Sequence, residues 1–463
     1  MIKYSLFSDG NDSCVHLEKD YKLNLFRKDE DIFVVKRDFL DKKDFFDDFS
    51  ISGSLTCNDV YCQLANIKHI GFEVTDSCNL QCTYCIYGKF YKNHDVRNMQ
   101  KMDVGKAKML IDFLVDKLNS PANTSSVNLV FISFYGGEPL LNMDFIQEIV
   151  QYTQQIQNHH ITFRYMMTTN AVYLKKFFPF LLKHDFILTV SLDGNEENDG
   201  HRKFSNGKPS FKVVFNNLKY IQKKYPEFFK ENIQFNSVLH NLNNHLELFS
   251  FIYEEFGKIT KFSTINPTGV KDEFRNEFVA LSKPKSMKKT TSYYKKMIKI
   301  LDLDSEEIIR LNKLVTHYSG NVFNSYNDLI INRKMIKHLP TATCLPFSKR
   351  IFMTVNNKIF PCERIGHQYA LGEVTDLSVN IDCKQIAEKY NSYFDSLRRL
   401  CLKCYHNRYC TQCLFDIYDL GGKPFCNQKG SMKQLQWYLD ESLKTLYNAP
   451  FLYRRIMTEI IEK

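Results

Sequence analysis

The sequence predicts an α/β fold in which six βα units form a partial, open barrel. From His69 onward, short apolar runs alternate with stretches of helical periodicity, which is the pattern of repeated βα units around a parallel sheet. Six units are fewer than a closed eight-unit barrel needs, so we expect the barrel to remain open. The chain has 463 residues, 44% of them hydrophobic, which is enough for a large core and two or three domains.

The expected strands are the short apolar runs that precede or separate the helical stretches. They lie at residues 69–75, 128–134, 161–169, 186–192, 233–239 and 261–265. In the first helical stretch, six apolar residues recur at the spacing of one helix face. These are Val104, Ala107, Leu110, Phe113, Leu114 and Leu118. We therefore expect a helix whose apolar face packs on the core.

Composition divides the chain into five segments. Residues 1–65 are charged and aromatic, and we expect a small accessory domain there. The barrel is expected over residues 66–270, followed by a helical bridging region, rich in lysine and tyrosine, over residues 271–343. Residues 344–430 are rich in cysteine and turns, and residues 431–463 have the pattern of a C-terminal packing helix.

Charge and hydropathy restrict the partners. The 62 basic and 52 acidic residues give a net charge of +10 that is spread along the chain, and no base-reading module accompanies it. We expect no nucleic-acid partner; an RNA-modifying enzyme is an alternative that a steep salt dependence of binding would indicate.

Residues 1–11 have no apolar signal region, and no run reaches the roughly 18 apolar residues of a membrane span. A cytoplasmic protein with no membrane partner is expected, and its fourteen cysteines favour metal ligands or buried small side chains over disulfides.

Three thiols lie within eight residues directly after the first expected strand, at Cys78, Cys82 and Cys85. Loops that follow barrel strands are where active sites form. Thiolates bind zinc, copper(I) or iron-sulfur clusters. A four-iron cluster ordinarily takes four cysteines, so three would leave one iron open to a chelating ligand. The structural alternative is a zinc knuckle completed by a distant histidine.

The Cys-x3-Cys-x2-Cys spacing, with Tyr84 before the last cysteine, resembles the signature of the radical S-adenosylmethionine (SAM) superfamily. Three further segments resemble motifs of that superfamily in the same order. They are Phe134-Tyr-Gly-Gly-Glu-Pro139, Thr168-Thr-Asn170 and Ser191-Leu-Asp-Gly194. The resemblance implies that a [4Fe-4S] cluster on the three cysteines cleaves SAM reductively. The resulting 5'-deoxyadenosyl radical would abstract hydrogen from a substrate.

The resemblance also implies the residues that contact SAM. Glu138 would accept a hydrogen bond from the methionine ammonium, while Gly136 and Gly137 would let the backbone approach the ligand. Arg202, in a shortened version of a His-Asp-x-x-Arg segment, would hold the carboxylate of the cofactor. The remaining contacts would come from strand ends, at Thr168, Asn170, Ser191 and Asp193. Taken singly, each of these residues could also be an ordinary turn or cap.

Eight further cysteines lie between residues 344 and 426, and seven of them, all except Cys383, make up the order considered next. A zinc ribbon would separate its Cys-x2-Cys pairs by about 12 to 20 residues, whereas five separate Cys404 from Cys410. The order instead resembles the SPASM domain of peptide-modifying radical enzymes, with Cys410-x2-Cys413 where Cys-x3-Cys is usual. The resemblance implies two auxiliary [4Fe-4S] clusters, three clusters in all, the first on Cys344, Cys362 and Cys413 and the second on Cys401, Cys404, Cys410 and Cys426. Cys383 could complete the first auxiliary cluster or be a free thiol.

Three segments, at residues 134–142, 236–240 and 360–365, make the resemblance more specific. Together with the length and the N-terminal extension, they are similar to the radical maturases of ribosomally made peptides in double-glycine-leader systems of Bacteroidales, over residues 66–430. This resemblance implies a precursor peptide with a leader as substrate, cross-linked or otherwise oxidised, and a flavodoxin or ferredoxin as electron donor. Residues 1–65 are hypothesised to bind the leader by β-strand addition.

Glu363, directly after Cys362, is a candidate catalytic base, because sulfatase-maturing relatives carry an aspartate at the matching position. The structural alternative is an ion pair, for which the neighbouring Arg364 is a candidate. The nearest competing function is a sulfatase maturase that forms formylglycine. Members of that class commonly begin almost directly at the first cysteine motif, whereas 77 residues precede Cys78 here. A non-catalytic peptide-binding protein stapled by metals is the other alternative.

Overall fold

In the computed structural model of the chain, the described residues form two compact units. The sheet unit comprises Thr56–Met287 and Leu345–Ala387, and the second unit comprises Met1–Leu55, Lys288–Cys344 and Glu388–Lys463. The structure describes residues 51–92, 94–125, 128–156, 160–285, 339–341, 343–404, 410, 412–427, 429–431, 434 and 437, and the backbone of four strands within residues 3–34. The expectations for most of the bridging region and of the C-terminal helix lie outside these residues.

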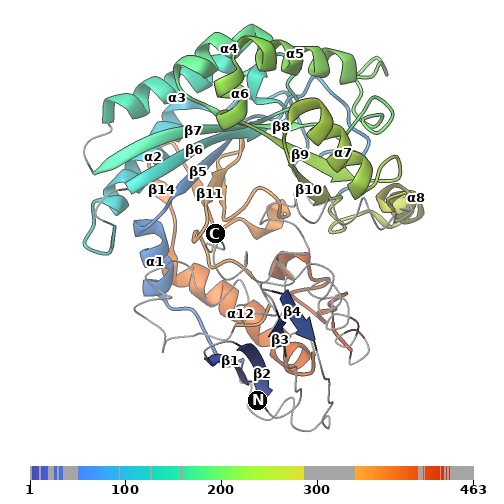
Figure 1. The fold of residues 1–463 in the computed structure, drawn as a ribbon. Helices are drawn as coiled ribbons and strands as arrows, with labels where there is room; N and C mark the ends of the chain where they lie inside the picture. Colours follow the sequence, from blue (N-terminus) through green and yellow to red (C-terminus); the bar gives the residue numbers. More distant parts are fainter. Residues whose placement is uncertain are drawn as a thin grey trace. The chain divides into compact units, whose positions relative to one another are not determined.

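The sheet unit is built on a sheet of ten strands among the described residues (Figure 1). Its parallel strands are β5 (His69–Thr75), β6 (Asn128–Gly136), β7 (Ile161–Thr169), β8 (Ile187–Ser191), β9 (Ile233–Leu239) and β10 (Thr260–Thr264). They are hydrogen-bonded side by side in the order of the chain, from β5 at one side to β10 at the edge. The strands lie where the sequence predicts them, which confirms the α/β class.

Helices lie along the outer side of this curved sheet (Figure 1). They are α2 (Val104–Leu118), α3 (Met143–Ile156), α4 (Leu174–Lys183), α5 (Phe211–Lys224), α6 (Pro226–Asn232) and α7 (His245–Phe256), with α1 (Cys57–Ala65) and α8 (Arg275–Ser282) nearby in the chain. Helix α2 begins after Asp103, whose carboxylate accepts a hydrogen bond from Lys106 N at 2.8 Å. Four of the six residues predicted on its apolar face are fully buried, and Val104 and Phe113 are half-buried.

The sheet continues beyond β5 with strands that the sequence did not reveal. Strand β11 (Ile351–Met353) pairs in parallel with β5, and an antiparallel meander of β12 (Lys358–Phe360), β13 (Gly372–Val374) and β14 (Val379–Asn380) follows. Strands of two or three residues are too short for an alternating pattern to be recognised. The first part of the segment 344–430 therefore extends the sheet that the six predicted strands form.

Alternation along the strands gives the sheet an apolar outer face and a polar inner face. On β6, Ile132 and Phe134 are buried, and the Phe134 ring contacts Phe145 of α3 with centroids 6.4 Å apart. Ser133 and Tyr135, which alternate with them, are half-buried on the opposite face. The inner face can therefore present polar side chains to a ligand.

The second unit contains two antiparallel strand pairs near the N-terminus. They are β1 (Lys3–Asp9) with β2 (Asp12–Glu18) and β3 (Leu25–Lys28) with β4 (Asp31–Val34). Helix α12 (Cys383–Leu402) is bound to the segment before α1, since the Asn391 side chain exchanges two hydrogen bonds of 2.8 Å with the Leu55 backbone. None of the described helices combines the length and the apolarity that crossing a membrane requires.

Candidate active site

The three clustered cysteines lie in the loop that follows β5, at the carboxyl end of the parallel strands. This loop is bound to the segment after β8, where Gln81 N donates to Lys203 O at 2.7 Å and Thr83 N donates to His201 O at 3.1 Å. A bridge between Leu80 and Phe204 continues the pairing. Two distant parts of the sequence therefore fix the position of the cysteine loop.

The thiols of this loop lie within electrostatic reach of one another. Burial, together with the neighbouring thiols of Cys85 and Cys78, raises the pKa of Cys82 to about 12 against a lowering by Arg202. Leu80 N approaches Cys78 Sγ at 3.4 Å, and an Arg97 guanidinium nitrogen lies 3.7 Å from Cys85 Sγ. Crowded, half-buried thiols are stabilised as thiolates by a metal core. The donor set fits an iron-sulfur cluster with three cysteine ligands.

The end of β6 lies against the start of the cysteine loop. Gly137 N donates to Thr75 O, and Glu138 N donates to Ser77 O, both at 2.9 Å. A Cβ on Gly136 would overlap the carbonyl oxygen of Thr75, and a Cβ on Gly137 would overlap that of Ser77. These glycines were expected to let the backbone approach a ligand. In the structure, the group that approaches them closely is the backbone at residues 75–77.

We expect Gly137→Ala to displace the cysteine loop, because the added methyl would overlap backbone atoms that cannot rotate away. Overpacking of this kind costs about 1–3 kcal/mol of stability. The apo-protein should lose this much free energy of unfolding in urea, and the loop should hold iron poorly. Gly421→Ala is the matched control, since a Cβ there meets no atom within 4 Å. Equal stability of the two variants would contradict the steric role.

Glu138 links the ends of β6 and β7. Its buried carboxylate accepts hydrogen bonds from Thr169 Oγ1 and from Asn170 N, both at 2.7 Å. Burial raises the pKa of Glu138 to about 7 in spite of these hydrogen bonds. The Asn170 side chain in turn donates to Asn79 Oδ1 at 2.7 Å, beside Cys78. A buried carboxylate next to the cysteine loop would be stabilised by a bound cation.

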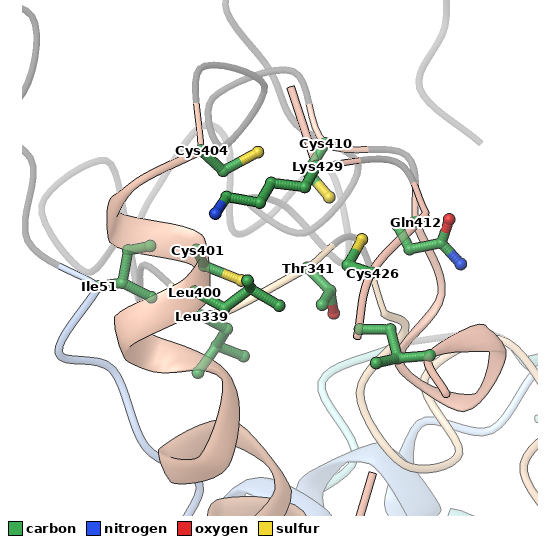
Figure 2. Close-up of a pocket in the computed structure, with 11 residues that line it drawn as sticks. Ile51, Leu339, Thr341, Leu400, Cys401, Cys404, Cys410, Gln412, Cys426 and Lys429 are labelled. Carbon is green, nitrogen blue, oxygen red and sulfur yellow. The ribbon is translucent and has the colours of Figure 1, made fainter. Parts of the chain in front are cut away.

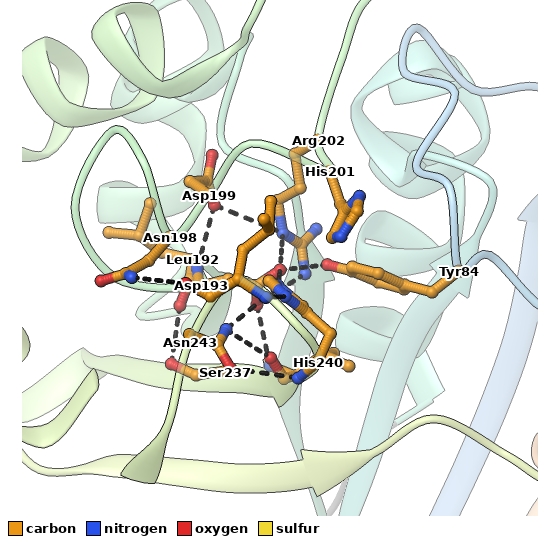
Figure 3. Close-up of polar contacts among 12 residues, drawn as sticks. Tyr84, Leu192, Asp193, Asn198, Asp199, His201, Arg202, Ser237, His240 and Asn243 are labelled. Atoms are coloured by element: carbon orange, nitrogen blue, oxygen red, sulfur yellow. Dashed lines mark hydrogen bonds and ion pairs between the residues drawn. The ribbon is translucent and has the colours of Figure 1, made fainter. Parts of the chain in front are cut away.

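Asp193 is the centre of a second polar network, at the end of β8 (Figure 3). Its fully buried carboxylate accepts hydrogen bonds from Arg202 Nε at 3.0 Å, from Val238 N at 2.8 Å and from the Tyr84 hydroxyl. Burial would raise the pKa of Asp193, but the Arg202 guanidinium holds it below its usual range. The network ties the cysteine loop to the carboxyl ends of β8 and β9.

Arg202 and Asp193 were both expected to contact the cofactor. In the structure, Arg202 is also buried, and it bonds Asp193 and approaches Asp199 at 3.6 Å. The Tyr84 ring centre lies 5.5 Å from this guanidinium, and the ring stacks on the His240 ring, with centroids 5.5 Å apart. The geometry favours a positioning role through Tyr84. His240, in the segment 236–240, was not among the expected site residues, although it contacts this network.

A cavity of about 260 Å³ opens on the inner face of the sheet. Its wall combines polar and apolar side chains from β5 to β11 with residues 350, 363 and 364. Among them are Ser133, Tyr135, Thr168, Thr189, Gln234 and Asn236. The cavity extends from Thr168, two residues before Asn170, to Glu363, which follows Cys362. One side of the cavity therefore lies next to Cys362.

The carboxylate of Glu363, the candidate base, forms an ion pair with an arginine side chain in this cavity. Its Oε2 accepts a hydrogen bond from Arg350 Nη1 at 2.8 Å and lies 3.6 Å from Cys362 Sγ. Burial would raise the pKa of Glu363, but Arg350 holds it below its usual value. The geometry favours the ion pair over the catalytic base. The partner in this ion pair is Arg350, whereas Arg364 was expected.

Four of the downstream cysteines line a single pocket in the second unit. Figure 2 shows Cys401, Cys404, Cys410 and Cys426 around this pocket, with Lys429 among them. Burial, together with the other three thiols, raises the pKa of Cys401 to about 12. Gly430 N also approaches Cys404 Sγ at 3.2 Å. These thiols, gathered from two chain segments in a largely apolar setting, fit an iron-sulfur cluster.

The remaining cysteines have separate surroundings. Burial raises the pKa of Cys413 to about 12, with further contributions from Asp416 and the Cys344 thiol, so the thiols of Cys344 and Cys413 interact. Cys362 follows β12 in the sheet unit. Burial also raises the pKa of Cys383 to about 11, and the thiol of Cys57 is the neighbour that adds most to this shift. Nothing in the described surroundings of Cys383 favours the ligand role over a free thiol.

Comparison with known proteins identifies relatives of the barrel and of longer parts of the chain. Residues 72–245 match the Radical SAM superfamily. An uncharacterized protein of Methanocaldococcus jannaschii is 35% identical over 160 residues, which are 34% of this chain and 50% of that protein. A cysteine-type anaerobic sulfatase-maturating enzyme of Clostridium novyi is 28% identical over 157 residues, 33% of this chain and 40% of that enzyme. This chain thus spans half or less of the length of these two relatives.

One relative matches over a longer range. The radical SAM cyclopropyl synthase TigE of Paramaledivibacter caminithermalis is 23% identical over 385 residues, 79% of this chain and 71% of that enzyme. The solved structure of native anSMEcpe with bound AdoMet and Cp18Cys peptide has a TM-score of 0.54 at 15% identity, covering 84% of this chain and 99% of that one. At this identity, the likeness shows a shared fold. Residues 72–245, which match the Radical SAM superfamily, thus lie in a chain whose fold is shared with anSMEcpe.

Proposed function

We propose that this chain is a radical SAM peptide maturase, which cleaves SAM reductively and oxidises or cross-links a ribosomally made precursor peptide. One observation carries the proposal: the cavity extends from Thr168 of β7, whose next residues Thr169 and Asn170 bond Glu138, to Glu363, which lies 3.6 Å from Cys362 Sγ. A peptide residue in this cavity would lie between a radical source and an electron acceptor. The cyclopropyl synthase and the sulfatase-maturating relatives support this class of function.

Cys78, Cys82 and Cys85 would hold the cluster that binds SAM. Bound there, the cluster and SAM supply the 5'-deoxyadenosyl radical. Glu138 would accept a hydrogen bond from the methionine ammonium, and Thr168, Asn170 and Ser191, at the neighbouring strand ends, would contact the rest of the cofactor. Asp193 and Arg202 would act through Tyr84, which they hold beside Cys85.

The downstream cysteines would form a SPASM-type domain with two auxiliary clusters. Cys401, Cys404, Cys410 and Cys426 are gathered around one pocket, which supports their assignment to one cluster. The other would use Cys344, Cys362 and Cys413, as the resemblance implies. These clusters would accept the electron that the substrate radical loses, and a flavodoxin or ferredoxin would reduce the cluster at Cys78. The strand pairs within residues 1–65 would bind the leader by β-strand addition.

Anaerobic reconstitution tests this function. The purified chain is loaded with iron and sulfide, and dithionite, SAM and a synthetic precursor peptide with a double-glycine leader are added. We expect about twelve irons per chain, formation of 5'-deoxyadenosine and loss of hydrogen from the peptide, measured by mass spectrometry. Zinc in place of iron, or no cleavage of SAM, would contradict the enzyme and leave a metal-stapled peptide-binding protein.

A sulfatase maturase that forms formylglycine is the second candidate. The Clostridium novyi relative and the fold shared with anSMEcpe favour it. Formylglycine is an aldehyde and reacts with hydrazides, whereas a cross-linked peptide does not. Labelling of the product by a hydrazide probe therefore separates the two candidates, and a labelled product would favour the maturase of sulfatases.

We expect SAM binding to weaken as the pH falls through about 7, because burial raises the pKa of Glu138 to about 7 in the free enzyme. Above this pH the carboxylate is charged and attracts the methionine ammonium; below it, the acid is neutral. At one pH unit below 7 the dissociation constant should rise about tenfold. Equilibrium dialysis with wild type and Glu138→Gln measures the effect. The variant should bind weakly at every pH, and the same pH dependence in both would exclude Glu138 as the cause.

A further inference from the structure

Arg97 places a positive charge beside one thiol of the cysteine loop. Its Nη2 donates to Cys85 Sγ at 3.7 Å, and its guanidinium carbon lies 4.1 Å from the centre of the Tyr87 ring. The side chain is half-buried. Burial raises the pKa of Cys78, and the charge of Arg97 is among the groups that oppose this rise. The charge therefore acts on two of the three thiols of the loop.

The segment that carries Arg97 is fixed to the strand end from which the cysteine loop begins. Asp76, directly after β5, is buried, and its carboxylate accepts hydrogen bonds from Asn98 N at 2.7 Å and from Gln100 N at 2.8 Å. Asp76 N in turn donates to Gln100 O at 3.3 Å. The cysteine loop and the segment of Arg97 thus share one anchor, which holds the guanidinium beside Cys85.

Among the residues that the structure describes, Arg97 forms no ion pair with a carboxylate, and its Nε is buried without a hydrogen-bond partner. Glu73 lies within electrostatic reach, but its two oxygens accept from the Tyr87 hydroxyl at 2.6 Å and from Val355 N at 3.1 Å. Both oxygens of Asp76 accept from backbone N–H groups. A guanidinium that is partly removed from water is costly without a countercharge. The countercharge of Arg97 is therefore expected at the thiols.

Arg202, the other guanidinium near these thiols, is in a different state. It acts on Cys82, but it also pairs with the buried carboxylate of Asp193 at 3.0 Å. Its charge is thus balanced within the protein, whereas the charge of Arg97 is balanced when the thiols are deprotonated. A cluster held by three thiolates is an anion, and the uptake of an electron adds one negative charge to it. A neighbouring cation without a carboxylate partner favours that uptake.

We propose that Arg97 sets the reduction potential of the cluster that Cys78, Cys82 and Cys85 would hold, with its guanidinium stabilising the reduced form through Cys85 Sγ. This inference rests on the proposed function, since it requires this cluster, and it adds a residue that governs the electron transfer. One electron passes from the reduced flavodoxin or ferredoxin to the cluster and then to the sulfonium of SAM. Arg97 supplies neither the electron nor a proton; it acts as a positioning residue. Charge and hydrogen bonds to the sulfurs are general determinants of such potentials.

A redox titration of the reconstituted full chain tests this role. The chain is reduced stepwise with titanium(III) citrate, without SAM or peptide, and followed by electron paramagnetic resonance. Arg97→Met removes the charge, whereas Arg97→Lys keeps the charge and loses the flat group over Tyr87. Arg164→Met is the matched control, because it removes the same charge where Arg164 pairs with the exposed Asp185 at 2.9 Å. The signal that is absent from Cys82→Ser identifies the cluster of the cysteine loop.

We expect Arg97→Met to lower the equilibrium constant for one-electron reduction of this cluster about tenfold, which is a fall of about 59 mV in its midpoint potential. Arg97→Lys should recover most of the shift, and Arg164→Met should keep the wild-type potential. If Arg97→Met does not retain iron, Arg97→Gln, which is neutral and can still donate to Cys85, should show a shift in the same direction.

Two results would overturn the inference. The first is a wild-type potential in a neutral variant of Arg97 that holds its full iron content. The second is an equal shift in Arg97→Met and Arg97→Lys, because the charge would then have no effect and the shape of the side chain would be the cause. A wild-type chain that holds no cluster on the cysteine loop would instead contradict the proposed function, so the two failures are distinguishable.

Discussion

Cys82→Ser should abolish the formation of 5'-deoxyadenosine and lower the iron content of the reconstituted chain from about twelve to about eight per chain. Serine keeps the size of the side chain but does not supply the soft thiolate that an iron-sulfur cluster needs. Cys82 is the thiol of the loop whose pKa burial raises to about 12, with Cys78 and Cys85 beside it. The loss of activity should be at least about a thousandfold, because the cluster is the source of the electron.

A matched control separates this effect from the loss of any cysteine. Cys62 lies on α1, outside the three-cysteine loop. Cys62→Ser should keep the iron content and the rate of the wild type. Iron counted by colorimetry and 5'-deoxyadenosine measured by chromatography are the readouts. If Cys82→Ser keeps the full iron content, Cys82 is not a ligand.

Asp193→Asn should lower the free energy of unfolding by about 3–5 kcal/mol, because it leaves the Arg202 guanidinium buried without its partner. The side chains of Arg202 and Asp193 are 8% and 0% exposed, so solvent cannot replace the lost charge. The same change weakens the anchor of Tyr84, and cleavage of SAM should also decline. Unfolding of the apo-protein in urea, followed by circular dichroism, measures the stability.

Glu196→Gln is the control for the Asp193 variant, because Glu196 pairs with Lys212 on the surface at 3.5 Å, with side chains 52% and 77% exposed. Exposed pairs of this kind contribute at most about 1 kcal/mol. The two variants remove the same charge, so a difference between their free energies of unfolding measures the effect of burying that charge. Unchanged stability of Asp193→Asn would refute the structural role of the network.

The position of the cysteine loop and of the Gly-Gly-Glu segment could be predicted from the sequence. Both follow apolar runs, and the carboxyl ends of neighbouring parallel strands meet at one edge of a sheet. Cys78 after β5, Glu138 after β6 and Asn170 after β7 therefore had to converge. In the structure these three strand ends are joined by hydrogen bonds, from Asn170 N to Glu138 and from the Asn170 side chain to Asn79.

The partners of the individual side chains could not be predicted in the same way. The pairing of Glu363 with Arg350 depends on β11, a strand of three residues that joins β5 across nearly 300 residues of sequence. Arg202 was expected to bind a cofactor, whereas in the structure it bonds Asp193. This contact forms because the segment after β8 turns back on the end of that strand. Contacts of this kind are determined by tertiary packing, which local patterns do not encode.

The most direct test of the peptide maturase is the transfer of hydrogen from the peptide to the cofactor. The wild-type chain is supplied with SAM, reductant and the precursor peptide carrying deuterium at the carbon positions of its core residues. The account predicts 5'-deoxyadenosine that contains one deuterium atom, together with a peptide that has lost deuterium. Unlabelled 5'-deoxyadenosine beside an unchanged peptide would show that the radical forms without attacking this peptide, and would contradict the account.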